Sequence, residues 1–336
     1  MLGATLRGPW IQPGHEGRPR IPAVAARYVV ALGGNALIPP GGTGTAEEQL
    51  ATVRLAAAQL APLAAEGAEL LLTHGNGPQV GNLLIKNEMA REVVPPMPLD
   101  WCVAQTQATI GLAIQAAVEW ELRRLHAERR VVVVLTRVVV DPLDPKRLEA
   151  TKPVGGAMSA ADAAARTDST HLYSEQPGGR WRRVVPSPEP VAILEESEIR
   201  HLLEAGAVVV AAGGGGVPVE EGGDGRYFGV EAVIDKDLTA SLLARRLDAE
   251  ALVILTDAPG ATINFGGPDQ RLLERVSPSI LRGFQAAGHF AAGSMGPKVE
   301  AALRFVEAGG PRAVIAGLSE AASAIRGECG TQVIRR

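Results

Sequence analysis

The sequence is poor in cysteine and in aromatic residues, and it carries no strong charge of either sign. Its 336 residues contain two cysteines, Cys102 and Cys329, which form neither a disulfide framework nor a metal-binding spacing. Aromatic residues make up 4% of the chain, so aliphatic side chains must supply the core. A net charge of −4 lacks the basic excess that is typical of a general nucleic-acid binder. We therefore expect a globular protein with an aliphatic core and no nucleic-acid partner.

Long hydrophobic runs are missing as well. The apolar stretches are too short or too interrupted to span a bilayer, so we expect no membrane partner. The first 26 residues mix Gly, Pro and Arg and lack the continuous apolar segment of a secretory signal. We expect a cytoplasmic protein in which residues 1–26 are a disordered leader or reflect a start assigned too early. Residues 27–336 would then form a single domain.

What the chain does contain is a repeated order of strand, loop and helix. Helix patterns cover residues 46–66, 100–126 and 195–204, among others, and they alternate with buried-strand patterns. These strand patterns are Tyr28–Leu32, Glu69–Thr73, Ala207–Ala212 and Ala251–Thr256. The alternation predicts an α/β fold with a mainly parallel central sheet. Loops that follow parallel strands meet at one edge of such a sheet, where ligands bind.

Four loops, most of them at strand ends, are rich in glycine, and they begin near Gly33, Gly75, Gly213 and Gly293. Backbone N–H groups in such loops, and at the helices that follow them, bind anions. Four adjacent glycines at 213–216 are costly in backbone entropy, which favours a close approach by a ligand. Each loop alone also fits a tight turn, and the spacing after Gly75 matches a dinucleotide fingerprint only imperfectly. Together the loops predict a crevice for two anionic groups.

Two lysines stand at predicted helix starts. Lys236 lies between Asp235 and Asp237, and Lys298 follows Pro297. Asp235 suits an N-cap, and Pro297 suits a first helical position. A cation at a helix start opposes the helix dipole by about 0.3–1 kcal/mol, so a bound anion and flanking carboxylates would explain it. The alternative is a capped surface helix with a solvated lysine.

Two further segments have a distinct composition. Val131–Val140 is nearly all valine and predicts a central parallel strand that is buried on both faces. Residues 141–190 are rich in proline and predict an excursion from the main sheet, partly a β-hairpin. Lys152 lies in this excursion, where it also fits a surface turn. Val217–Val230 predicts a second hairpin.

The chemistry that these parts suit is phosphoryl transfer. It requires in-line positioning and charge compensation, which backbone N–H groups and lysines supply without a general base when the acceptor is already an anion. The sequence has no GxSxG, HExxH, CxxC or P-loop motif. We expect His74 to make a hydrogen bond within its loop and to transfer no proton.

Several motifs, taken together and in order, resemble the carbamate kinase branch of the amino acid kinase family. They are Gly33–Ala36, His74–Gly81, Trp181–Pro188, Gly213–Pro218, Glu231–Asp237 and Gly293–Glu300. The resemblance covers residues 27–334. It implies a three-layer αβα sandwich with an eight-stranded, mainly parallel sheet, a protruding subdomain over 141–190, and a homodimer. The implied reaction is reversible phosphoryl transfer from ATP to carbamate, which gives ADP and carbamoyl phosphate, with Mg²⁺.

The resemblance also implies roles for individual residues. Lys236 and Lys298 would stabilise the transferring phosphoryl group, and Asp237 would hold both lysines. Asp235 would lie near the metal and the phosphates, and Lys152 would reach in from the excursion. No protein ligand to the metal is assigned. The carbamate or carbamoyl phosphate would contact Gly33, Gly34, Asn35, Gly75, Asn76 and Gly77. The nucleotide would contact Gly214, Gly215, Asp257, Met295 and Lys298.

The sequence departs from the family in two places. Gly156–Met158 replaces Pro-Phe-Tyr, and Ala258 follows Asp257 where the family commonly has Val, with an aromatic residue nearby. Three alternatives stay open. They are a kinase of this fold acting on another small carboxylate, a catalytically silent binding protein, and a dinucleotide-dependent oxidoreductase. The last leaves Lys236, Lys298 and the run at Gly213 without a role.

Overall fold

The computed structural model describes residues 25–33, 44–167, 171–176, 178–291 and 293–335. Residues 1–24 of the expected leader lie outside the described residues. So do Gly34 and Asn35 of the first glycine loop.

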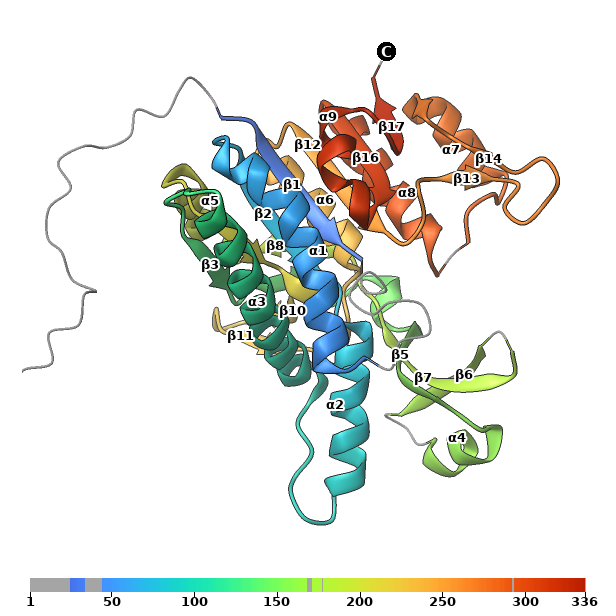
Figure 1. Cartoon of the computed structure of the whole chain (residues 1–336). Helices are drawn as coiled ribbons and strands as arrows, with labels where there is room; N and C mark the ends of the chain where they lie inside the picture. The colour runs from blue at the N-terminus through green and yellow to red at the C-terminus, as the bar shows by residue number, and fades with distance from the viewer. Residues whose placement is uncertain (1–24, 34–43, 168–170, 177, 292, 336) are drawn as a thin grey trace, which may run out of the picture.

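An eight-stranded sheet forms the middle layer of the molecule (Figure 1). Its strands are β1 (Arg27–Leu32), β2 (Glu69–His74), β3 (Val131–Val134), β9 (Val208–Ala211), β12 (Ala251–Thr256), β15 (Arg275–Val276), β16 (Arg312–Gly317) and β17 (Thr331–Ile334). Their order is β15-β17-β16-β12-β1-β2-β9-β3, and every neighbouring pair is parallel except β16 and β17. The inner strands are covered on both faces, which explains their aliphatic sequences. The predicted mainly parallel sheet is confirmed.

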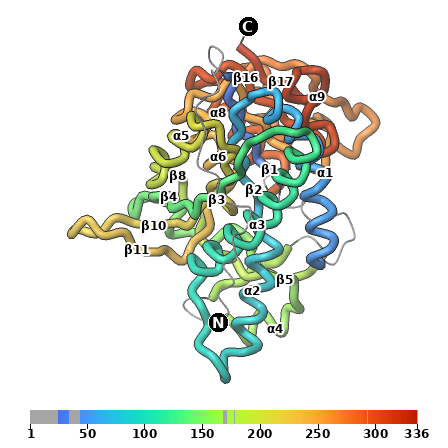
Figure 2. The backbone as a smooth tube through the Cα atoms, turned by 60° about the vertical axis from the view of Figure 1, so that its left-hand side comes forward, coloured from blue at the N-terminus to red at the C-terminus, as the bar shows by residue number. Residues whose placement is uncertain are grey.

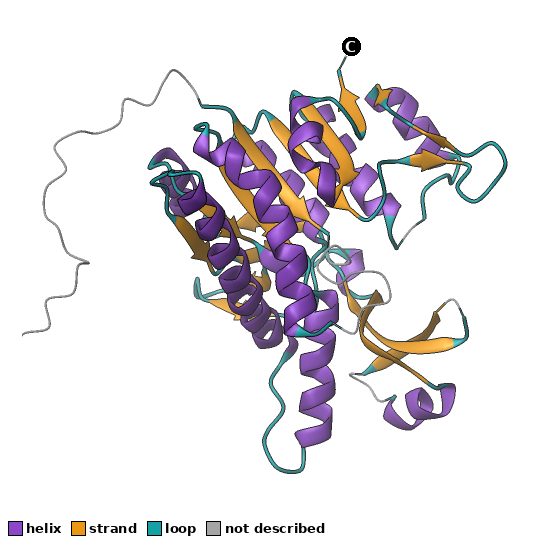
Figure 3. Ribbon diagram, in the orientation of Figure 1, coloured by secondary structure: helices purple, strands orange, loops and turns teal. Residues whose placement is uncertain are grey.

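Helices cover both faces of this sheet (Figure 3). One layer contains α1 (Ala46–Ala65), α3 (Leu99–Arg124) and α9 (Ala321–Arg326), and the opposite layer contains α5 (Glu196–Glu204), α6 (Lys236–Arg246), α7 (Pro278–Ala286) and α8 (Met295–Glu307). Aliphatic side chains fill the space between the sheet and each layer, with Leu60 and Leu72 on one side and Leu243 and Leu303 on the other. The three-layer αβα fold is confirmed. None of the helices in the described part of the chain has the length and apolar character that crossing a bilayer requires.

A second sheet of four strands lies beside the main one. It contains β4 (Arg137–Val140), β8 (Pro190–Ile193), β10 (Val217–Glu221) and β11 (Tyr227–Gly229), in the order β11-β10-β4-β8. Strands β10 and β11 form the hairpin predicted over Val217–Val230, and Figure 2 shows it projecting from the body of the molecule. A short hairpin of β13 (Thr262–Ile263) and β14 (Arg271–Leu272) completes the small strands outside the excursion.

The excursion contains a sheet of its own. Strands β5 (Ala150–Met158), β6 (Leu172–Gln176) and β7 (Arg180–Pro186) pair in the antiparallel order β5-β7-β6, beside the short helix α4 (Ala160–Arg166). This sheet stands off the main body and faces α2 (Gly77–Ala90) (Figure 1). A Cβ atom at Gly81 would lie 2.8 Å from Cα of Gly155, and one at Gly156 would lie 2.9 Å from Cδ1 of Ile85. Glycine at these positions therefore allows β5 to lie against α2, including at Gly156, where the sequence departs from the family that it resembles.

The prediction of one central strand over Val131–Val140 is wrong. The run divides into β3, which is the last strand of the main sheet, and β4, which belongs to the second sheet. Gln107 of α3 stabilises the break between β3 and β4. Its Nε2 donates to the Thr136 carbonyl at 3.0 Å, and its Oε1 accepts from the Thr136 N–H at 2.9 Å. Valine favours a strand, but composition does not specify which strand it pairs with.

Candidate active site

The glycine loops at Gly33 and Gly75 begin side by side at the carboxyl edge of the main sheet. The Gly33 N–H donates to the Leu255 carbonyl at 2.9 Å, and the Gly75 N–H donates to the Leu32 carbonyl at 2.9 Å. These bonds continue the ladders of β1 with β12 and with β2 beyond the strand ends. The loops after the parallel strands therefore meet at one edge, as the repeated strand–loop–helix pattern predicts.

The glycine run after β9 is packed against the protein itself. Ala212, Gly214, Gly215 and Gly216 all have left-handed backbone conformations, with φ between 52° and 92°. A Cβ atom at Gly213 would lie 2.2 Å from Nε2 of His74, and one at Gly214 would lie 2.1 Å from Nδ2 of Asn76. A close approach by neighbouring loops thus requires glycine at both positions, and the expected close approach by a ligand stays a prediction. The nucleotide roles of Gly214 and Gly215 remain predictions.

His74 is buried at the end of β2. Its Nδ1 lies 3.0 Å from the Gly75 carbonyl oxygen. The pKa of His74 is lowered to about 4, mainly by burial. The Gly75 carbonyl opposes this shift, and the charge of the nearby Lys236 adds to it. The imidazole is therefore neutral at neutral pH, and the predicted hydrogen bond within its loop is present.

Asn76 precedes α2 and is buried beside the glycine run. Its Nδ2 donates to Oγ1 of Thr106 at 2.8 Å, and this hydroxyl donates to the Val103 carbonyl at 2.7 Å. The Asn76 side chain makes no capping bond, so it leaves the first N–H groups of α2 available to an anion. Thr106 was not among the predicted site residues. The only feature of the sequence that pointed to Thr106 was its position among polar residues near the start of a long predicted helix.

The start of α6 has the geometry that the sequence predicts. Asp235 is its N-cap, and Oδ1 of Asp235 accepts from the Asp237 N–H at 2.9 Å. The next residue, Lys236, is the first of the helix, and its side chain is 11% exposed. The alternative of a surface helix with a solvated lysine is therefore wrong.

Asp237 joins the two predicted lysines. Its side chain is 3% exposed, and it forms ion pairs with Nζ of Lys236 through Oδ1 and with Nζ of Lys298 through Oδ2, the latter at 3.3 Å. Lys298 comes from α8, which begins at Met295, so Pro297 is the third helical residue rather than the first. Desolvation lowers the pKa of Lys236, and Lys298 adds to this effect, while the Asp237 carboxylate opposes it.

The excursion adds a third lysine to this group. Nζ of Lys152 lies 2.7 Å from Oδ2 of Asp235, and the Lys152 side chain is 36% exposed. Burial alone would raise the pKa of the Asp235 carboxyl, but Lys152, Lys236 and the Asp237 N–H together hold it below its usual value. We call these five residues, three lysines and two aspartates, the lysine cluster. Its three ammonium groups and two carboxylates leave one net positive charge, which suits an anionic ligand.

Three further predicted residues, Asp257, Met295 and Gly77, are not members of this cluster. Asp257 follows β12 and is exposed, and its Oδ1 accepts from the Thr256 hydroxyl at 3.0 Å. Met295 is the first residue of α8 and packs in part against the core. Gly77 is the first residue of α2. The roles of all three toward ligands remain predictions.

Glu231, in the segment that leads into α6, makes two contacts that the sequence did not predict. Oε2 of Glu231 accepts from the Leu99 N–H at 3.1 Å, and its Oε1 accepts from Nη2 of Arg183 at 2.8 Å. It therefore connects the start of α3 with β7 of the excursion. The motif Glu231–Asp237 pointed to this residue, but no local pattern pointed to its partners.

Residues 26–317 match the amino acid kinase family. The chain belongs to this family. A carbamate kinase of Pyrococcus furiosus is 46% identical and covers 92% of this chain and 99% of its own length. A carbamate kinase of Trichomonas vaginalis is 41% identical over the same share of this chain and 99% of its own.

Solved structures also resemble this chain over most of its length. A carbamate kinase from Giardia lamblia, bound to AMP-PNP, has a TM-score of 0.86 at 39% identity and covers 93% of this chain and 99% of its own. A protein from Aeropyrum pernix has a TM-score of 0.88 at 44% identity, with coverage of 92% and 100%. An N-acetylglutamate synthase from Neisseria gonorrhoeae, at 18% identity and a TM-score of 0.56, shares the fold alone.

Proposed function

We propose that this protein is a carbamate kinase, which transfers a phosphoryl group reversibly between ATP and carbamate. The observation that carries the proposal is the lysine cluster at the carboxyl edge of the sheet, next to the loops at Gly75 and Gly213. The similarity to carbamate kinases over nearly the whole chain supports the choice of acceptor.

In the direction of ATP synthesis, the bond between phosphorus and the carbamate oxygen of carbamoyl phosphate breaks. A bond forms between the same phosphorus and a terminal β-phosphate oxygen of ADP, and carbamate leaves as an anion. No proton is transferred in this step, so no general base is needed. Asp237 holds the ammonium groups of Lys236 and Lys298 in position, and these groups would compensate the negative charge of the transferring phosphoryl group. Lys152 adds a third positive charge.

The two substrates would occupy different parts of the sheet edge. Gly33 and Gly75 lie at the ends of β1 and β2, where their N–H groups extend the hydrogen-bond ladders of the sheet. Asn76 is the N-cap of α2 and Gly77 is its first residue, and this helix start, which has no side-chain cap, suits the carbamoyl phosphate. Asp257 and Met295 follow β12 and begin α8, on the side that we assign to the nucleotide. The predicted roles of Gly34 and Asn35 fall outside the described residues.

A magnesium ion would arrive with the nucleotide. Among the described residues, no three His, Cys, Asp or Glu side chains form a group that could hold a metal ion. Both oxygens of Asp235 already accept a hydrogen bond, yet each carboxylate oxygen can take a second partner. These residues fit an ion that phosphate oxygens and water bind for the most part, with Asp235 beside it. When bound, Mg²⁺ supplies further charge compensation to the phosphates.

The direct test is to mix purified protein with ADP, Mg²⁺ and carbamoyl phosphate and to measure ATP. We expect ATP to form in proportion to enzyme and time. Folded protein that makes no ATP would refute the proposal. Parallel reactions with acetyl phosphate and with N-acetylglutamate plus ATP distinguish a kinase for another carboxylate. Ligand binding without turnover would indicate a binding protein of this fold.

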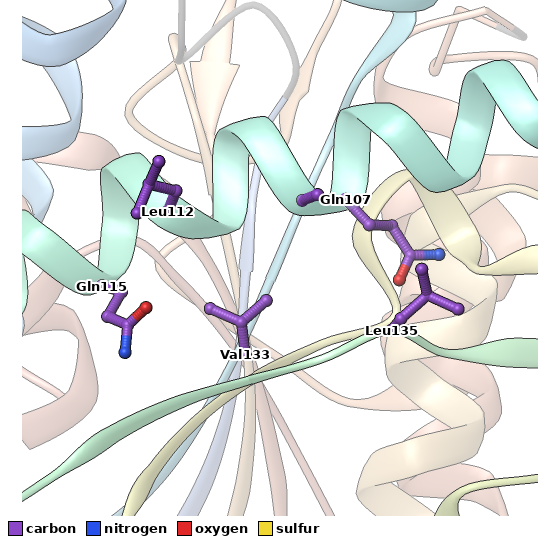
Figure 4. A pocket seen from close by; sticks show the side chains of 6 residues that line it. Gln107, Leu112, Gln115, Val133 and Leu135 are labelled. Carbon is purple, nitrogen blue, oxygen red and sulfur yellow. The ribbon is translucent and has the colours of Figure 1, made fainter.

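We also propose that the protein forms a homodimer through the outer face of α3 and β3. Trp101, Leu112 and Trp120 of α3 are each at least 60% exposed. Leu112 and Leu135 line a hollow of about 390 Å³ between α3 and the edge of the main sheet (Figure 4). Gln115 of α3 donates to the Val131 carbonyl at 2.7 Å, so part of the strand edge is satisfied and the face offers mainly apolar side chains.

The dimer proposal is tested by light scattering during gel filtration. Leu112→Glu would place a charge in the centre of this face and is expected to shift the mass from dimer to monomer. Leu143→Glu is the matched control, because Leu143 is 85% exposed and belongs to the excursion rather than to α3 or β3. A wild-type monomer, or a Leu112→Glu dimer, would contradict this interface. Cytoplasmic localisation also stays a prediction.

A further inference from the structure

A chain of alternating charges joins the base of the excursion to the helix that carries Lys298. Nη1 of Arg304 lies 2.6 Å from Oε2 of Glu189, and its Nη2 lies 3.2 Å from Oε1. Nζ of Lys146 lies 2.5 Å from the same Glu189 Oε1. On the other side, Nε of Arg304 lies 2.6 Å from Oε1 of Glu300, which also pairs with Arg282 of α7 at 2.6 Å.

Glu189 lies where the excursion returns to the main body. Its N–H donates to Oδ2 of Asp144 at 2.7 Å, so the entering and leaving segments are tied together at this point. The register of β5 with β7 places Lys152 opposite Val185, directly before the end of β7. Few residues therefore separate Glu189 from the strand position that faces Lys152.

Arg304 lies close in sequence to Lys298, just as Glu189 lies close in sequence to the strand position that faces Lys152. It lies on α8 less than two helical turns after Lys298. A two-point contact between a guanidinium and a carboxylate fixes orientation as well as distance. Burial alone would raise the pKa of the Glu189 carboxyl, but hydrogen bonds from Arg304 and Lys146 hold it below its usual value, so the pair is charged at neutral pH.

We propose that Glu189 and Arg304 are positioning residues, which hold the excursion against α8 and thereby hold Lys152 in a fixed place relative to Lys298. The kinetic part of this inference depends on the proposed phosphoryl transfer, whereas the structural part does not. Neither residue belongs to the lysine cluster, and their effect on the reaction passes through the position of Lys152.

Hydrogen exchange tests the structural part without any turnover. In Arg304→Gln, amides of β5 and β7 are expected to exchange about tenfold faster, because a charge-assisted contact at the base of the excursion is lost. Arg282→Gln is the matched control. It removes the same charge and a contact to the same Glu300, but Arg282 has no contact with the excursion among its described bonds. Exchange in β5 and β7 should stay at the wild-type rate in this control.

Kinetics test whether the effect passes through Lys152. Arg304→Gln is expected to lower kcat about tenfold, since a small displacement of a positioned group is enough for such a loss. In the Lys152→Met background the same change should lower kcat no further, because its target has been removed. Glu189→Gln should reproduce both results, and it replaces Arg304→Gln if that variant does not fold.

Three results would overturn the inference. They are wild-type exchange in β5 and β7 of the folded Arg304→Gln and Glu189→Gln variants, equal effects of Arg282→Gln, and full additivity of Arg304→Gln with Lys152→Met. A wild-type protein without carbamate kinase activity would instead refute the proposed function, and the exchange experiment would still decide the coupling.

Discussion

The sheet edge and the excursion hold their lysines in different ways. At the sheet edge, Lys236 and Lys298 are 11% and 13% exposed and share the carboxylate of Asp237, which is 3% exposed. In the excursion, Lys152 is 36% exposed and pairs with Asp235. The first two lysines come from helices that pack on the main sheet, while the third comes from a small antiparallel sheet with shifts in its register.

This difference indicates that the lysines of the two regions contribute to the site in different ways. A buried ion pair is fixed because separating it would leave an unpaired charge in the protein interior. A half-exposed pair is weaker, because water screens it and competes for both partners. Charge compensation by Lys236 and Lys298 is therefore a constant property of the core, whereas the contribution of Lys152 depends on where the excursion lies.

The largest expected effect follows removal of a core charge. Lys236→Met keeps the length of the side chain and removes its ammonium group, so we expect kcat for ATP formation to fall about a thousandfold. Arg245→Met is the matched control, because Arg245 is exposed in the last turn of the same helix. A Lys236→Met rate within tenfold of the wild type would remove Lys236 from the transfer step.

The next effect concerns stability rather than rate. Asp237→Asn would leave two buried ammonium groups without their shared carboxylate, so we expect the free energy of unfolding to fall by roughly 3 kcal/mol. Urea denaturation followed by circular dichroism measures this change. Asp248→Asn serves as the control, because Asp248 is exposed. Equal unfolding midpoints for Asp237→Asn and the wild type would show that the lysines do not depend on this carboxylate.

The core is also expected to respond to mild acid through His74. Because burial lowers the pKa of His74 to about 4, the unfolded chain takes up the proton first as the pH falls below the usual value of 6.5. The neutral His74 side chain therefore contributes fully to the stability of the folded protein above pH 6.5, and this contribution is lost as the pH falls to about 4. We expect a loss of roughly 2 kcal/mol between pH 7.5 and 5. Urea denaturation across this range should show a shallower pH dependence in His74→Gln, and an identical slope would contradict the assignment.

The smallest effect is expected in the excursion. Lys152→Met should lower kcat about tenfold and leave the unfolding free energy nearly unchanged, because a half-exposed pair adds little to stability. Lys86→Met, at an exposed position of α2, provides the comparison. An unchanged kcat would mean that Lys152 acts only at the surface. A loss as large as that of Lys236→Met would abolish the distinction between the two regions.

Local features of the site were predictable because their signals lie within a few residues. The N-cap at Asp235, the first turn of α6 and the strands β1, β2 and β9 all follow from short patterns. Contacts between distant segments were not predictable in this way. Lys298 meets Asp237 across 61 residues and Lys152 meets Asp235 across 83, and only the resemblance to a family suggested that these residues come together.

The fold was predictable to a similar extent. Alternation of strand and helix patterns indicated the parallel sheet, since both periodicities are local. The partner of each strand is not local, which is why Val131–Val140 was assigned to one strand although β3 and β4 enter different sheets. The glycine run at 213–216 shows the same limit, because Gly213 and Gly214 lie against His74 and Asn76, which are distant in sequence.

The break between β3 and β4 also sets where the chain tolerates a change in length. A single-codon deletion at Leu135 or Thr136 would shift β4 by one position and turn the buried Val138 and Val140 outward. The turn at Gly178–Gly179 in the excursion offers the opposite case, since both glycines are left-handed and a Cβ atom at Gly178 would meet no atom within 4 Å. Insertion libraries, affinity tags and natural length variation should therefore accumulate at the excursion turn and be absent from the valine run.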